Sequence, residues 1–106
     1  MVHMNELITD TGISDLLLIF SVKSHLIAVR PELDGHIDVD DHRPRLSFLT
    51  PQGAVVVSKS ECTPAGRWTV TGPGIGVKSP RPSPAELCAA ALVAYERGRR
   101  NAPSAA

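Results

Sequence analysis

Histidine and aspartate side chains concentrate in one short stretch of the chain. If this stretch is a β-strand, His36, Asp38 and Asp40 project from one face at intervals of roughly 6–7 Å, and His42 follows. Imidazole nitrogens and carboxylate oxygens bind divalent metals, and a His–Asp pair can transfer protons. The spacing matches neither HExxH nor the EF-hand order. We therefore favour a solvated edge strand whose charges discourage aggregation, with a metal site at these four residues as an alternative.

A second stretch that could do chemistry is Gly72–Gly76, followed by Lys78. Backbone amides of a glycine-rich loop can hold a phosphate. However, Pro80 and Pro82 separate these glycines from the next predicted helix, so a crossover loop from strand to helix is favoured. No GxSxG elbow or pair of catalytic carboxylates is found. The sequence favours a protein that is not an enzyme, and we expect no cofactor.

The two parts of the chain carry opposite charge. Residues 1–42 have a net charge of −6 and residues 43–106 a net charge of +6. A continuous basic surface in the second part would bind phosphates, so nucleic acid is an alternative partner, and Trp68 is the one aromatic residue suited to base stacking. The residues assigned to that alternative are Arg45, Arg67, Arg97, Arg99 and Arg100.

Composition places the chain among ordinary globular proteins, with 42% apolar and 21% charged residues. Cys62 and Cys88 are too few and too far apart for a disulfide framework. The longest apolar run, Leu16–Phe20, is far shorter than the roughly 20 residues of a membrane span, and no signal peptide is evident. We therefore expect no membrane partner and a cytoplasmic location. The predominance of arginine over lysine, with abundant Ala and Pro, suggests a GC-rich bacterial genome.

The C-terminal region has the clearest helix signal. Ser83–Glu86 reads as a capping box with proline at the first helical position, in which Ser83 and Glu86 bond each other's backbone amides. Apolar residues then recur at three- and four-residue intervals, and Gly98 is the expected stop. These apolar residues are Leu87, Cys88, Ala91, Leu92 and Tyr95.

Strands are predicted in the middle of the chain. Arg45–Leu49 and Ala54–Ser58 flank a Pro-Gln-Gly turn and should form a hairpin. Alternation of apolar and polar residues predicts further strands at Arg67–Thr71 and His36–Asp40.

Residues 12–29 can be interpreted in two ways. Ile13, Leu16, Leu17, Phe20, Ser24 and Ile27 fall on one helical stripe, which favours a helix with this stripe toward the core. The alternative is a hairpin of two buried strands, but the intervening residues lack the Gly, Asn or Pro of a tight turn.

Together these elements predict an α+β fold over residues 1–100. A small antiparallel β-meander of three to four strands packs against an N-terminal and a C-terminal helix, and residues 101–106 form a disordered tail. The apolar run Leu16–Phe20 is wider than one helical stripe, so Leu18 or Ile19 should point away from the core and should need a partner surface to cover it. We therefore expect a regulatory or interaction module that binds protein, with self-association through Leu18 or Ile19.

Overall fold

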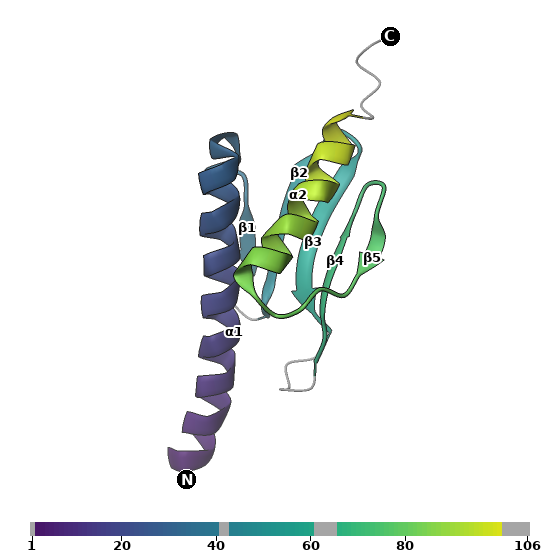
Figure 1. Ribbon diagram of the computed structural model, residues 1–106. Helices are drawn as coiled ribbons and strands as arrows, with labels where there is room; N and C mark the ends of the chain where they lie inside the picture. Colours follow the sequence, from purple (N-terminus) through teal and green to yellow (C-terminus); the bar gives the residue numbers. More distant parts are fainter. Residues whose placement is uncertain (1, 41–42, 61–65, 101–106) are drawn as a thin grey trace.

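Two helices and a five-stranded antiparallel sheet make up the described part of the protein (Figure 1). The computed structural model describes residues 2–40, 43–60 and 66–100, and for residues 2–13 and 100 the backbone alone. The strands follow one another in the order β1-β2-β3-β4-β5, so the sheet is a meander. The predicted α+β fold is confirmed, with five strands rather than three to four. The elements are α1 (Val2–Val29), the 3-10 turn η1 (Pro31–Leu33), β1 (Asp38–Asp40), β2 (Arg45–Thr50), β3 (Gly53–Lys59), β4 (Trp68–Gly72), β5 (Gly76–Lys78) and α2 (Pro84–Arg100).

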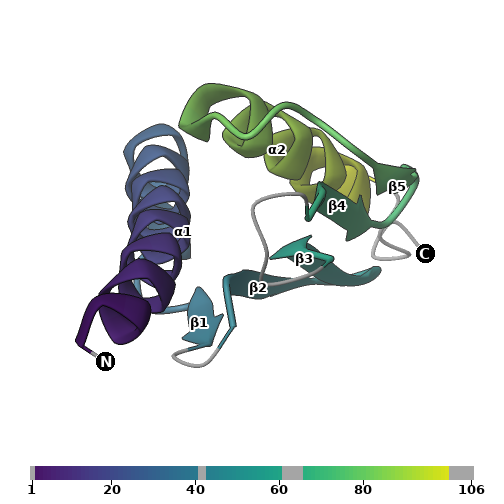
Figure 2. The same cartoon turned by 90° about the horizontal axis from the view of Figure 1, so that it is seen from below.

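Alternation along the strands gives the sheet one buried face. Leu46 pairs with Val57, and Val57 pairs with Val70, so these β-branched and aliphatic side chains point to the same side. Helix α2 lies over this side and α1 stands beside β1, which leaves the opposite face of the sheet without a helix among the described residues (Figure 2). The core side chains from the sheet are Leu46, Phe48, Val55, Val57, Trp68 and Val70.

Helix α1 settles the ambiguity of residues 12–29. The segment is helical throughout, and the alternative of a strand hairpin is wrong. The stripe that enters the core is nevertheless not the predicted one, because Ile19, Val22 and Leu26 are fully buried while Leu17 and Phe20 are exposed. The helix has two apolar stripes on different faces, and periodicity by itself does not say which of them meets the sheet and α2.

Helix α2 begins as predicted. The Glu86 amide donates to the Ser83 hydroxyl at 3.2 Å. The Glu86 carboxylate accepts from the Arg81 amide at 3.2 Å, two residues before the Ser83 amide expected for a capping box. The apolar stripe is also found, with Leu87, Cys88, Ala91, Ala94 and Tyr95 buried and Leu92 partly buried against the core.

Two glycines let α2 approach the sheet closely. A Cβ on Gly72 would lie 2.7 Å from the Ala94 Cβ, so strand β4 and α2 touch where both residues are small. Gly98 was expected to end the helix, but the helix continues to Arg100. A Cβ on Gly98 would lie 2.6 Å from the Cβ of Thr50 at the end of β2, so this glycine serves packing rather than termination.

The sheet differs from the prediction at both edges. The first strand begins at Asp38 rather than His36, because Asp34–His36 form a turn in which Gly35 has a φ of +84°. The glycine-rich stretch expected to be a crossover loop contains a tight turn between β4 and β5, with φ of +79° at Gly74 and +59° at Gly76. A positive φ is costly for residues with a Cβ, so the turn itself accounts for glycine at positions 74 and 76.

Candidate functional site

The largest apolar side chains that α1 exposes, among those the structure describes, form a second stripe. Leu17 is 61% exposed and Phe20 46% exposed, three residues apart and therefore on adjacent turns. The half-buried Leu16 and the exposed Ser24 lie beside them by helical spacing, whereas the half-buried Ile27 packs against the core. We call Leu16, Leu17, Phe20 and Ser24 the outer face of α1. These four residues belong to the stripe that the sequence assigned to the core.

Helix α1 is longer than the sheet it packs against. Its 28 residues span about 42 Å at 1.5 Å per residue. The longest strand, β3, has 7 residues and spans about 23 Å. Figure 1 shows the first turns of α1 extending past the end of the sheet. Among the described side chains, the first to bond the sheet is Asp15, whose carboxylate accepts from Lys59 Nζ at 3.0 Å.

The residues predicted to contact a partner need correction. Ile19 has no exposed surface and belongs to the core of its own chain. Leu18 is partly buried and packs against that core. The apolar run therefore does have a side that points away from the core, but Leu17 and Phe20 occupy it. The reason is the orientation of the helix, which turns the face at 15, 19, 22 and 26 toward the rest of the protein.

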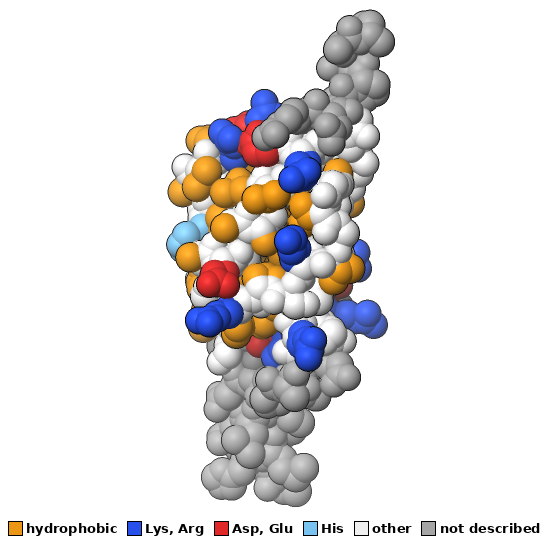
Figure 3. Space-filling model, turned by 45° about the vertical axis from the view of Figure 1, so that its right-hand side comes forward, with side chains coloured by type: hydrophobic (Ala, Val, Ile, Leu, Met, Phe, Trp, Pro, Cys, Tyr) orange, Lys and Arg blue, Asp and Glu red, His pale blue; other side chains and the backbone are white. Residues whose placement is uncertain are grey.

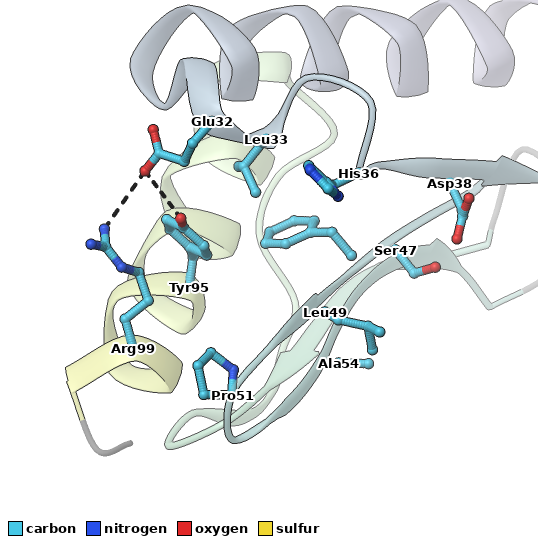
Figure 4. A pocket seen from close by; sticks show the side chains of 11 residues that line it. Glu32, Leu33, His36, Asp38, Ser47, Leu49, Pro51, Ala54, Tyr95 and Arg99 are labelled. Atoms are coloured by element: carbon cyan, nitrogen blue, oxygen red, sulfur yellow. Dashed lines mark hydrogen bonds and ion pairs between the residues drawn. The ribbon is translucent and has the colours of Figure 1, made fainter. Parts of the chain in front are cut away.

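A groove opens beside the end of β2 (Figure 4). It encloses about 530 Å³, and its walls come from η1, the start of β1, the hairpin between β2 and β3, and the last turns of α2. Apolar and polar side chains line it in similar numbers. The lining residues are Glu32, Leu33, His36, Asp38, Ser47, Phe48, Leu49, Pro51, Ala54, Tyr95 and Arg99.

One wall of the groove is a small polar network. The Tyr95 hydroxyl donates to Glu32 Oε2 at 3.1 Å, and Arg99 Nη1 lies 3.7 Å from the same oxygen. The Arg99 guanidinium also stands 5.3 Å from the centre of the Tyr95 ring, within range of a cation–π contact. These contacts hold three side chains from η1 and α2 in fixed positions.

The network shifts two pKa values in opposite directions. A backbone hydrogen bond to the Glu32 carboxylate, supported by the Tyr95 hydroxyl and the nearby Arg30 and Arg99, lowers the pKa of Glu32. Burial, followed by the hydrogen bond to Glu32 and its negative charge, raises the pKa of Tyr95. Near neutral pH the pair is therefore a carboxylate that accepts from a neutral phenol.

The proposed metal ligands are not brought together within the described part of the chain. His36 and Asp38 are exposed on the rim of the groove, and Asp40 accepts from the Arg43 amide at 3.3 Å. No group of three or more His, Cys, Asp or Glu side chains in the described ranges is arranged to hold a metal ion. His42 lies outside the described residues.

The basic residues assigned to nucleic acid are divided between two sides of the molecule. Arg45 is opposite Ser58, and Ser58 is opposite Thr69, so these three side chains lie on the face of the sheet without a helix. Arg67 is two residues before Thr69 and therefore lies on the same face. Arg97 and Arg99 are on α2, which covers the other face. The side chain of Arg100 is outside the described part.

The described arginines therefore do not form one continuous basic stripe, and no exposed aromatic side chain lies among them to stack with bases. On the side of the molecule seen in Figure 3, the basic side chains are separated by apolar and uncharged ones. Trp68, the residue predicted to stack with bases, is 4% exposed and belongs to the core.

Comparison of the chain with models of protein families, with curated proteins and with solved structures finds no match to any of them. Neither helix, over the residues that the structure describes, has an apolar stretch sufficient to cross a bilayer. The site must therefore be interpreted from its own geometry.

Two features of the candidate surfaces were missed at the level of sequence. The outer face of α1 was recognised as an apolar stripe but was assigned to the core. A second apolar stripe, through Ile19, Val22 and Leu26, is visible in the sequence and could have indicated that another face of the helix enters the core. The groove has no local sequence signal, because its walls come from residues 32 to 99 and meet only after folding.

Proposed function

We propose that this chain is a non-enzymatic protein-interaction module that associates with a second copy of itself through the outer face of α1. The observation that carries the proposal is the exposure of Leu17 and Phe20 on adjacent turns of a helix whose other face is already buried. Large apolar side chains that lie together on a surface favour a protein partner, because burying them removes about 25 cal/mol of unfavourable hydration per Å².

Self-association suits the shape of this helix. The outer face runs along a straight helix at the edge of the molecule (Figure 1) and is turned away from the buried face at Ile19, Val22 and Leu26, so the helix of a second copy can lie along it without meeting the sheet of the first. In a pairing with two-fold symmetry the same patch is used by both copies, so Leu17 and Phe20 of each meet the corresponding face of the other. A stable interface of this kind buries at least about 1,000 Å² in total.

Light scattering coupled to size-exclusion chromatography tests the proposal. Phe20→Asp places a charge in the centre of the outer face without touching the core, so we expect wild type to be a dimer and this variant a monomer. Val93→Asp is the matched control, because Val93 is 48% exposed, similar to Phe20, but lies on α2. The control should remain dimeric. A wild-type chain that is monomeric throughout a dilution series would overturn the proposal.

A further inference from the structure

The size of the side chains on the outer face of α1 changes along the helix. The large ones, Leu16, Leu17 and Phe20, lie within little more than one turn. Toward the C-terminus the face continues with two exposed small residues, Ser24 about one turn after Phe20 and Ala28 about one turn after Ser24. The face therefore has a bulky part followed by a shallow part.

This gradient distinguishes the two ways in which a second α1 can lie along the first. Packed helices have axes about 8–10 Å apart, and the side chains at the contact set that distance. In a parallel pair Leu17 meets Leu17 and Ser24 meets Ser24, so the distance that suits the leucines leaves a gap between the serines. In an antiparallel pair the Leu17 of each copy meets the Ser24 of the other. Large side chains then oppose small ones at both ends of the contact, which fills the space between the helices.

The charges along α1 favour the same orientation. Glu6 and Asp10 are the charged residues of the segment 2–14, and Lys23 is the charged residue of the segment 16–29 when histidine is neutral. A parallel pair sets the two acidic segments side by side. An antiparallel pair moves them to opposite ends, far beyond the screening length of about 8 Å at physiological salt. The dipoles of two antiparallel helices also attract each other.

We propose that the two copies pair with α1 antiparallel and with the two-fold axis between Phe20 and Ser21. The inference rests on the proposed function and specifies the surface that receives the outer face. Leu17 of each copy packs onto Ser24 of the other, and the two Phe20 side chains lie beside each other near the axis. Roughly 18 residues of each helix overlap, a length of about 27 Å.

The rest of the molecule leaves room for this pairing. The buried stripe of α1, through Ile19, Val22 and Leu26, faces the core of its own chain. Figure 2 shows the sheet and α2 on one side of α1. In the antiparallel pair the two helices therefore lie in the middle, and the sheet and α2 of each copy lie on the outside.

Disulfide trapping in the full chain tests the orientation, because two cysteines can bond only when their Cα atoms are within about 7 Å. The background variant is Cys62→Ser, and Cys88 stays in place because it is 5% exposed. An equal mixture of Leu17→Cys and Ser24→Cys chains, distinguished by a mass tag, is oxidised and separated by electrophoresis without reductant. We expect the mixed disulfide to be the main product. Ser24→Cys without the other chain should stay reduced, because its two sulfurs are offset by about 10 Å along the helices.

Two controls frame the result. Ser21→Cys lies next to the proposed axis and should bond to itself in either orientation, so it shows that the helices are in contact. Val93→Cys is 48% exposed but lies on α2, and it should give no mixed disulfide with Ser24→Cys.

Failure of the orientation can be told apart from failure of the dimer. A dimer by light scattering in which Ser24→Cys bonds to itself would overturn the antiparallel pairing and leave the proposed function in place. A dimer that forms neither the mixed disulfide nor the Ser21→Cys disulfide would also overturn it, because the contact would lie elsewhere. A monomer by light scattering at every concentration would overturn the proposed function and this inference together.

Discussion

Lys59 at the end of β3 and Asp15 on α1 form an ion pair that is nearly closed to solvent. The Lys59 ammonium lies 3.0 and 3.2 Å from the two carboxylate oxygens of Asp15, and the side chains are 5% and 13% exposed. The pair lies on the same face of α1 as Ile19, Val22 and Leu26. It therefore fixes the rotation of the helix, and with it the direction in which the outer face points.

Removing the carboxylate of this pair should destabilise the fold strongly. Asp15→Ala leaves the Lys59 ammonium buried without its counter-charge, and we expect a loss of about 3 kcal/mol in the free energy of unfolding, measured by urea denaturation. Asp34→Ala, at an exposed carboxylate, should cost far less. Replacing both partners, as Asp15→Leu with Lys59→Met, should recover most of the loss. A similar small effect of Asp15→Ala and Asp34→Ala would show that the pair contributes little.

Gly98 provides a test of close packing against helix propensity. Alanine is favoured over glycine in a helix by about 1 kcal/mol. At this position, however, a Cβ would lie 2.6 Å from the Thr50 Cβ and 3.0 Å from its Cγ2. Overpacking of this kind costs about 1–3 kcal/mol. Urea denaturation should therefore show Gly98→Ala to be less stable than wild type.

The companion variant identifies the clash. Thr50→Gly removes the side chain that a Cβ on Gly98 would meet, so the double variant should lose clearly less stability than the sum of the two single variants. Gly98→Ala more stable than wild type would mean that the end of α2 can move away from β2 at little cost.

Tyr95 is the only tyrosine in the chain, so the tyrosinate absorbance reports its ionisation alone. Burial and Glu32 raise its pKa above the ordinary value of about 10. Because the folded pKa is the higher one, the stability linked to the neutral phenol is present below pH 10 or so and is lost as the pH rises through the folded pKa. We expect a titration midpoint above that of the unfolded chain.

The Glu32→Gln variant separates the causes of this shift. Removing the negative charge should lower the Tyr95 midpoint, but burial should keep it above the ordinary value. Glu86→Gln, at a carboxylate that does not contact Tyr95, should leave the midpoint in place. An unchanged midpoint in Glu32→Gln would contradict the hydrogen bond between the two side chains.

Local sequence signals predicted the helices and strands better than they predicted the contacts between them. The serine cap at Ser83 and the apolar stripe of α2 depend on residues within one or two turns, and both were predicted. The hairpin between β2 and β3 was predicted for the same reason, since its turn residues are contiguous. Strand β5 was missed because its 3 residues follow a glycine-rich turn and carry one apolar side chain, Val77, which is exposed.

Tertiary relationships account for the other differences. Whether Leu17 or Ile19 enters the core depends on which face of α1 meets α2 and β2, and both faces satisfy the same periodicity. Gly98 has the sequence context of a helix stop, yet its use is decided by Thr50, 48 positions away in the chain. The groove at Leu49 depends on a turn at Gly35 that ends β1 early.

The two stripes of α1 can be separated by a pair of alanine substitutions two residues apart. Ile19 is fully buried, so Ile19→Ala should cost about 2–4 kcal/mol, the range for a large side chain deleted from a core. Leu17 is exposed, so Leu17→Ala should cost less than about 0.5 kcal/mol in a chain diluted to the monomer. If the outer face binds a second copy, the melting temperature of wild type rises with protein concentration, because association stabilises the folded state by mass action. Leu17→Ala should weaken that dependence and Phe20→Asp should abolish it. Equal losses of monomer stability in Ile19→Ala and Leu17→Ala would mean that both stripes are buried within one chain, which leaves α1 no free face for a partner.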